Sequence, residues 1–226
     1  LFILFICFIL IYELNYVLKY ILNKNNKLFQ KQKEARQLYI VKNISKSFIL
    51  FLVCIRFIFI IVKAYKLKSL NNFDIKSMAS IYVANDIVAL LTVHNLPTTT
   101  KKHHIVTTGL LFVNYLINYE DLSLVSTKIG ILLIGYAIFS ALAFLVNFYL
   151  GTRFIISSKN IQDKLRRVAL NNYKICIYLN WTLQLLFIIG TLMYDINLAL
   201  PYLIYFLVMI PIIKDDLILV SWLEKK

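Results

Sequence analysis

The sequence predicts an all-α fold, a polytopic membrane bundle of about seven transmembrane helices. Of the 226 residues 60% are hydrophobic, and only five are Gly and three are Pro. The chain repeats apolar runs of roughly 17 to 22 residues, the length of a helix that crosses a hydrocarbon layer about 30 Å thick. Backbone groups in lipid must bond within their own segment, so we expect each run to be helical.

Seven apolar runs follow one another along the chain. They cover 1–22, 47–66, 79–96, 104–119, 129–150, 173–194 and 197–213. The fourth and the last are short for a membrane span. The first run begins without an initiator Met or a basic stretch, and it contains Glu13, Asn15 and Lys19. This pattern does not fit a cleavable signal peptide, and we expect the chain to begin inside a longer product.

Lys and Arg residues alternate between the two ends of these spans. Seventeen of the 25 fall in the segments 23–46, 97–103, 151–172 and 214–226. Because such residues are enriched in short loops on the cytoplasmic or matrix side, these four segments are expected to share that side. A count of seven spans satisfies this expectation and places residue 1 on the opposite side. A count of six would move half of the basic segments to the wrong side.

The basic segment after the first run also suggests the domain organisation. We assign 1–41 to a leading transmembrane helix with a basic interfacial segment, and 42–226 to the main transmembrane domain. The formal net charge is +14, but apolar residues are interleaved with the basic ones between Lys24 and Lys46. This pattern is typical of a segment lying on anionic lipid headgroups, and we expect membrane lipids but no nucleic acid as partners.

No sequence motif indicates a cofactor or a metal ion. Cys7, Cys54 and Cys176 lie in or beside apolar runs, at spacings unlike those of metal ligands. A Gly-rich phosphate loop, a CxxC pair and an HExxH helix are all absent from the sequence. We therefore expect no cofactor and no metal site.

Ionisable residues inside the apolar runs are informative because a charge at membrane depth is costly. Glu13, Arg56 and Asp86 lie near the middle of the first three runs. Since neighbouring spans are antiparallel, we expect an intramembrane ion pair of Arg56 with Asp86 or with Glu13. The alternative is that Asp86 orients or charges a histidine. His94 is the weaker candidate, because it lies about 80° away from Asp86 around the helix.

A histidine pair opens the fourth run. His103 and His104 directly follow Lys101 and Lys102. We take His103, His104 and Asp86 as candidate catalytic residues. The two lysines are candidate headgroup-binding residues, because they attract a lipid phosphate or carboxylate and favour a neutral imidazole nearby.

A polar strip continues from the second histidine along one face of that helix. The face shared with His104 contains Thr107, Thr108, Leu111 and Tyr115. Such a strip is expected to face other helices or a cavity. Threonine hydroxyls in a membrane helix also bond to their own backbone carbonyls, which is the simpler interpretation of the two threonines.

An Asp within one span and a His-His pair that starts the next resemble the TLC domain family, shared by TRAM proteins, ceramide synthases and smaller TLC-domain proteins. The similar elements are Tyr82-Val-Ala-Asn-Asp86 and Lys102-His103-His104-Ile-Val-Thr107. The resemblance covers 42–226 and ends with Lys214-Asp-Asp-Leu. It is nearer to the small TLC-domain proteins than to the ceramide synthases.

The resemblance implies six helices in a barrel and, in the ceramide synthases, transfer of an acyl group from acyl-CoA to a sphingoid amine at the His pair. His103 and His104 are the matching positions. The enzymes of that branch carry further His and Asp residues after the His-His helix, whereas this chain continues with Asn118-Tyr-Glu120-Asp121. This difference argues against a true ceramide synthase and leaves open whether the chain is an enzyme.

Two classes of function remain from the sequence. One is lipid binding or lipid chemistry, which predicts an enclosed apolar cavity that reaches the His pair. The other is a non-catalytic accessory subunit of a large membrane complex, for example a mitochondrial respiratory assembly, with other membrane subunits as partners. A channel or transporter is the weakest interpretation, because inverted repeats are absent. The endoplasmic reticulum and the mitochondrial inner membrane are the two expected locations.

Overall fold

The computed structural model describes residues 1–67, 69–93 and 96–225, and it confirms the all-α membrane bundle. Helices make up 87% of the structure, with no strand among the described residues. The helices are α1 (Phe2–Asn25), α2 (Lys27–Gln30), α3 (Glu34–Leu67), α4 (Asn72–Thr92), α5 (Thr98–Leu116), α6 (Val125–Leu142), α7 (Phe144–Thr152), α8 (Lys159–Leu192), the 3-10 turn η1 (Ile196–Leu198) and α9 (Ala199–Lys225).

Six helical segments of the described chain are long and apolar enough to cross a membrane, which makes the protein an integral membrane protein. They are α1, α3, α4, the α6–α7 segment, α8 and the η1–α9 segment. The remaining predicted span is α5, whose first turns carry threonine, lysine and histidine. Because it packs between α4 and α9, this more polar helix still belongs to the bundle.

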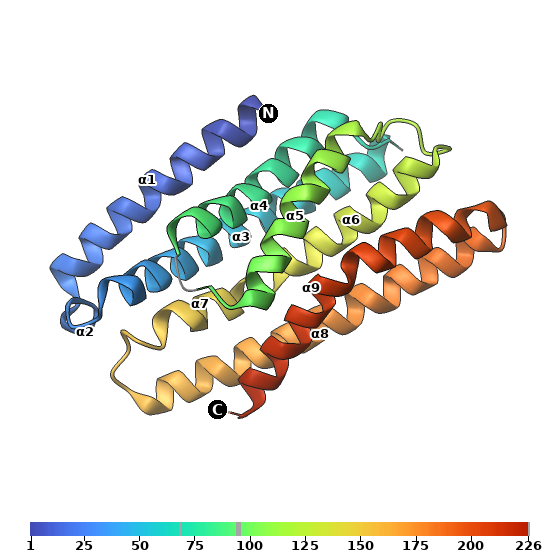
Figure 1. The fold of residues 1–226 in the computed structure, drawn as a ribbon. Coiled ribbons are helices and arrows are strands. Elements are labelled where there is room, and N and C mark those ends of the chain that lie inside the picture. Colours follow the sequence, from blue (N-terminus) through green and yellow to red (C-terminus); the bar gives the residue numbers. More distant parts are fainter. Residues whose placement is uncertain (68, 94–95, 226) are drawn as a thin grey trace.

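The helices after α1 close a ring. Along the ring α3 contacts α4, α4 contacts α5, α5 contacts α9, and α9 contacts α8. The α6–α7 segment contacts both α8 and α3, and so completes the circle. The leading helix α1 lies outside this ring against α3 and α4, on the side away from the α8–α9 pair (Figure 1).

Local sequence explains where several helices begin and bend. The side chain of Asn71 accepts a hydrogen bond from the backbone N–H of Asp74 and starts α4, and Ser158 starts α8 in the same way through Ile161. The single apolar run 129–150 becomes two helices, because the backbone at Ala143 leaves helical geometry. Pro211 lies inside α9, where it removes one helical hydrogen bond.

α3 is much longer than the predicted span. It starts at Glu34, so the second half of the basic segment 23–46 is helical and continuous with the apolar run. The domain boundary suggested at 41–42 therefore falls inside this helix. As a result, residues assigned to an interfacial loop, Lys42 and Lys46 among them, are buried in the ring.

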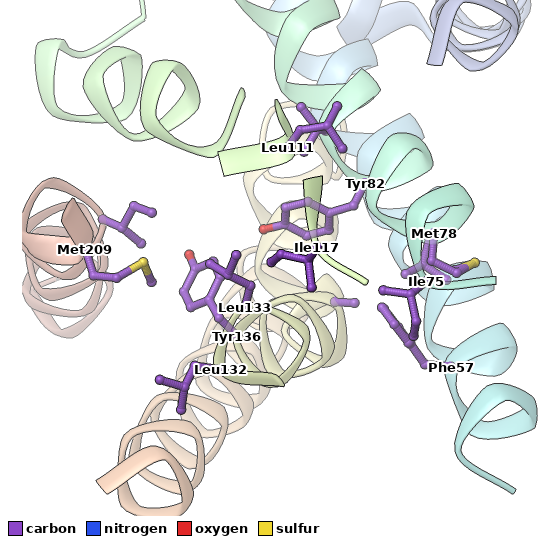
Figure 2. Close-up of a cluster of buried hydrophobic side chains, with 14 of the residues drawn as sticks. Phe57, Ile75, Met78, Tyr82, Leu111, Ile117, Leu132, Leu133, Tyr136 and Met209 are labelled. Atoms are coloured by element: carbon purple, nitrogen blue, oxygen red, sulfur yellow. The ribbon is translucent and has the colours of Figure 1, made fainter. Parts of the chain in front are cut away.

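The apolar core fills the half of the ring that lies away from the basic segments. Figure 2 shows Tyr82 and Tyr136 pointing from α4 and α6 into this cluster, with Leu111, Ile117 and Met209 nearby. The remaining apolar space between α4, α5 and α6 amounts to about 60 Å³. That volume is too small for a hydrocarbon chain, so the core is packed rather than hollow.

Close packing of α7 on α3 depends on Gly151. A Cβ atom at this position would lie 2.7 Å from Ile44 Cγ1 and 3.0 Å from the backbone oxygen of Ile40. We expect Gly151→Ala to destabilise the fold by about 1–3 kcal/mol, because backbone cannot move aside. Gly135→Ala is the matched control: a Cβ there meets nothing within 4 Å, so greater helix propensity should leave stability unchanged or slightly higher. Thermal unfolding in detergent compares the two, and equal effects would refute the close contact.

Candidate functional site

A cavity of about 380 Å³ lies inside the ring, at the end where α3, α5 and α8 begin and α7 and α9 end. Every helix of the ring contributes to its lining, and these contributions include Lys46, Tyr82, His104, Ser140, Tyr173 and Asp216. A cavity is therefore present next to the His pair, and charged side chains such as Lys46 and Asp216 share its wall with apolar ones such as Leu50 and Val146.

Asp86 is the fixed centre of the site. Its side chain is completely buried on α4. The ammonium group of Lys46 lies 2.6 Å from Asp86 Oδ1, and the hydroxyl of Thr107 donates a hydrogen bond of 2.7 Å to Oδ2. Both carboxylate oxygens are thus held, from α3 on one side and from α5 on the other. This arrangement compensates the cost of burying the charge.

His104 lies against this carboxylate. Its Nδ1 is 3.0 Å from Asp86 Oδ1, close enough for an ion pair although off line for an N–H···O hydrogen bond. Its Nε2 is buried and has no hydrogen-bond partner among the described residues. A carboxylate at Nδ1 favours the tautomer with the proton on that atom, which leaves a lone pair on Nε2.

His103 belongs to a second acid–histidine pair. Its Nδ1 lies 3.4 Å from Asp215 Oδ2, and Thr100 donates a hydrogen bond of 3.0 Å to Asp215 Oδ1. The two imidazole rings are 5.5 Å apart in an edge arrangement. Consecutive helical residues usually point about 100° apart, but both histidines are buried and both line the cavity. The site therefore contains two Asp–His pairs side by side.

The far wall of the cavity carries phenols and a third carboxylate. Tyr173 donates a hydrogen bond of 2.7 Å to Asp216 Oδ1, which joins α8 to α9. Tyr82 and Ser140 join α4 to α6 through a hydroxyl contact of 2.6 Å. These bonds fix the wall opposite the histidines.

Two further cations, Lys42 and Arg153, line the cavity. Lys42 precedes Lys46 by one helical turn on α3 and is 7% exposed. Arg153 follows α7, and its guanidinium lies over the rings of Phe154 and Trp222 at 4.5 and 4.4 Å. Burial lowers the pKa of this guanidinium from its usual value, which indicates that its charge is poorly solvated.

The predicted ion pair of Arg56 with Asp86 or Glu13 is wrong. Arg56 instead pairs with Asp74 at 2.8 Å, and Lys63 approaches the other oxygen of Asp74 at the same distance. Ten residues separate Arg56 from Lys46, a rise of about 15 Å along α3. Because α3 and α4 are antiparallel, the position opposite Asp86 belongs to Lys46 and the position opposite Arg56 belongs to Asp74.

The other predicted residues have different environments. Glu13 is exposed on α1, and no ion pair of it is found within the described part of the chain. Lys101 and Lys102 are also exposed and do not line the cavity, so contact with lipid headgroups stays a prediction. His94 lies outside the described residues.

The polar strip after the histidine pair serves two purposes. Thr107 bonds to Asp86 and to the backbone oxygen of His104, whereas Thr108 bonds to that backbone oxygen. Tyr115 shares a hydroxyl contact of 2.6 Å with Ser80 on α4. The strip therefore faces other helices, and one of its members, Thr107, contributes directly to the site.

Asp86, His103 and His104 could also hold a metal ion. One donor atom from each lies within 4.8 Å of the others, and two imidazoles with a carboxylate suit several transition metals. However, the ammonium group of Lys46 already contacts Asp86 Oδ1, and Thr107 takes Oδ2. A metal ion would have to displace Lys46, so the donor set fits a resident lysine better than a metal.

Sequence reasoning missed Lys46, Asp215 and Asp216 as parts of the site. The spacing of Lys42 and Lys46 was a usable signal, because residues four apart share one face of a helix that leads straight into an apolar run. The two aspartates follow the last predicted run and lie inside α9, which continues to Lys225. A comparison of the chain with protein-family models, with curated proteins and with solved structures finds no match.

Proposed function

We propose that the protein is a TLC-like membrane protein that binds lipid and transfers an acyl group at its histidine pair. The observation that carries this proposal is the presence of two Asp–His pairs on one cavity inside a six-helix ring. The ring agrees with the helical barrel that the resemblance to the TLC domain family implies. The departure after the His-His helix still separates the chain from the ceramide synthases.

The geometry around His104 suits general base catalysis. Nε2 carries the free lone pair, and Asp86 stabilises the imidazolium that forms when this atom takes a proton. In the proposed step, Nε2 takes the proton of an acceptor hydroxyl or amine as the acceptor oxygen or nitrogen bonds to the acyl carbon. The bond from that carbon to its leaving group then breaks, and the proton passes from Nε2 to the leaving group.

The size of the cavity restricts what enters it. A volume of about 380 Å³ is at the lower end of small-molecule sites and holds a polar head with the reacting carbonyl. Because the apolar core beyond Tyr82 is filled, a long acyl chain has to lie along the outside of the ring. The substrate class favoured by this arrangement is an amphiphile whose polar end enters from the basic end of the bundle.

An accessory subunit of a large membrane complex is the second candidate, and Glu13 favours it. This acid is exposed on α1, a helix in which Ile11 alone is fully buried. A carboxylate at membrane depth needs a partner, which a neighbouring subunit would supply. Lipid chemistry suits the endoplasmic reticulum, whereas an assembly role suits the mitochondrial inner membrane.

Native mass spectrometry of the gently solubilised protein separates the two candidates. We expect a single chain that carries a defined lipid, and we expect His104→Ala to reduce that lipid at least tenfold while the chain stays folded. Thr108→Ala is the control, because this side chain bonds to its own helix. Recovery only within a larger complex, with no lipid dependent on His104, would contradict lipid handling and support the accessory subunit.

A further inference from the structure

Lys42 is a buried cation in the wall of the cavity. Its side chain lines the cavity, and among the described residues no carboxylate lies within ion-pair distance of its ammonium group. Asp86 and Asp215 attract it only through space, and Asp86 is already paired with Lys46. A buried ammonium group without a close partner is costly, so an anion in the cavity would be strongly favoured beside it.

Arg153 offers a second cation with unused donors. Its Nε and Nη1 atoms are buried and have no hydrogen-bond partner in the described part of the chain. The rings of Tyr39, Phe154 and Trp222 lie against the guanidinium and hold its plane. A guanidinium fixed in this way is suited to bind two oxygens of a phosphate or carboxylate at once.

An apolar groove of about 550 Å³ leads away from the cavity along one face of α9. Its apolar lining is Ile210, Ile213, Leu217, Ile218 and Trp222. Ile218 and Trp222 line the cavity as well, so the groove and the cavity meet at these two residues. A hydrocarbon chain in the groove would therefore reach Trp222, whose ring lies against the Arg153 guanidinium.

We propose that the site binds a phosphate-bearing amphiphile, with its phosphate between Lys42 and Arg153 and its hydrocarbon chain in the α9 groove. This inference rests on the proposed function because it uses the same cavity. It adds the chemical class of the ligand that the cavity binds. A phosphate monoester carries between one and two negative charges at neutral pH and offers three acceptor oxygens. These properties match one ammonium group and one forked guanidinium.

The test compares three probes on the purified full chain in a neutral detergent. Oleoyl lysophosphatidic acid carries both phosphate and chain, oleoyl monoacylglycerol has the chain alone, and inorganic phosphate has the charge alone. The readouts are the melting temperature and the fluorescence of Trp222 in a Trp181→Phe background, since the chain has two Trp residues. We expect saturable binding of lysophosphatidic acid with both a thermal shift and a change in Trp222 emission, and little effect of the other two probes.

Two variants locate the phosphate. Arg153→Gln should weaken binding of lysophosphatidic acid roughly 10- to 100-fold, because charge-assisted hydrogen bonds are lost. Lys42→Met should weaken binding similarly and yet raise the melting temperature of the unliganded protein, because it removes a buried charge that has no close partner. Lys66→Met is the control: this lysine is exposed in the last turn of α3, outside the cavity, so neither quantity should change.

Several outcomes would overturn the inference. Equal stabilisation by monoacylglycerol would show that the phosphate is not recognised. Equal stabilisation by inorganic phosphate would show that the hydrocarbon chain is not recognised, and the ligand would then be a soluble phosphate ester rather than a lipid. Unchanged binding in Arg153→Gln would also contradict it. The catalytic proposal is tested by the acyl-transfer rate of His104→Ala, whereas this inference is tested by binding of lysophosphatidic acid to Arg153→Gln and Lys42→Met, so the two failures give different results.

Discussion

Asp86→Ala is expected to destabilise the protein by about 3–5 kcal/mol, the largest effect of any single substitution proposed for this chain. The substitution leaves the ammonium group of Lys46 in the buried site without its partner at 2.6 Å, and it removes the acceptor for the Thr107 hydroxyl. Unfolding by heat or by increasing sodium dodecyl sulfate in mixed micelles measures the loss.

A double substitution tests whether that loss comes from the unpaired lysine. Asp86→Leu combined with Lys46→Met removes both charges, and we expect it to recover much of the stability. Glu224→Ala is the matched control, because Lys174 and Glu224 also lie 2.6 Å apart but are substantially exposed. That pair is expected to contribute less than about 1 kcal/mol. A double variant no more stable than Asp86→Ala would refute the buried pair.

Under the proposed function, His104→Ala is expected to reduce acyl transfer by roughly 10²- to 10⁴-fold, the range for loss of a general base. The assay supplies an alkyne-tagged acyl thioester in liposomes made from a native lipid extract and measures tagged lipid products. Added imidazole should restore part of the lost rate, because the truncated side chain leaves space beside Asp86. A structural role for His104 predicts no such rescue.

Two controls make this result interpretable. Thr108→Ala should retain the wild-type rate, since the Thr108 hydroxyl bonds to the backbone of its own helix. His103→Ala should lower the rate less than His104→Ala, because the 3.4 Å contact of His103 with Asp215 holds its ring less closely. Equal rates for wild type and His104→Ala would disprove the catalytic role, whatever lipid the protein binds.

Part of the candidate site could be predicted from sequence and part could not. Asp86, His103 and His104 stand out because polar residues are rare in apolar runs, and the structure brings all three together. The ion-pair partner of Asp86 could not be predicted from the sequence in the same way. Which residue lies opposite it depends on the axial offset between α3 and α4, and Arg56 and Lys46 differ by about 15 Å in that direction.

The basic residues were misassigned for a related reason. A Lys-rich segment before an apolar run has the same composition whether it lies on the membrane surface or continues the helix into a bundle. In this protein α3 starts at Glu34, and the ring closes around its first turns. Lys42, Lys46 and Arg153 then become cavity residues although their positions in the sequence look like loop positions.

The sequence by itself determined the membrane class, the helical content and the approximate spans, because these depend on hydropathy and on the need to satisfy backbone groups within lipid. It also identified Asp86, His103 and His104, the polar residues that the structure brings together. The tertiary structure alone decided that six helices close a ring, that Lys46 rather than Arg56 pairs with Asp86, and that α9 brings Asp215 to His103. These outcomes depend on helix offsets and rotations, which are set by packing between segments far apart in the chain and are not encoded in any local pattern.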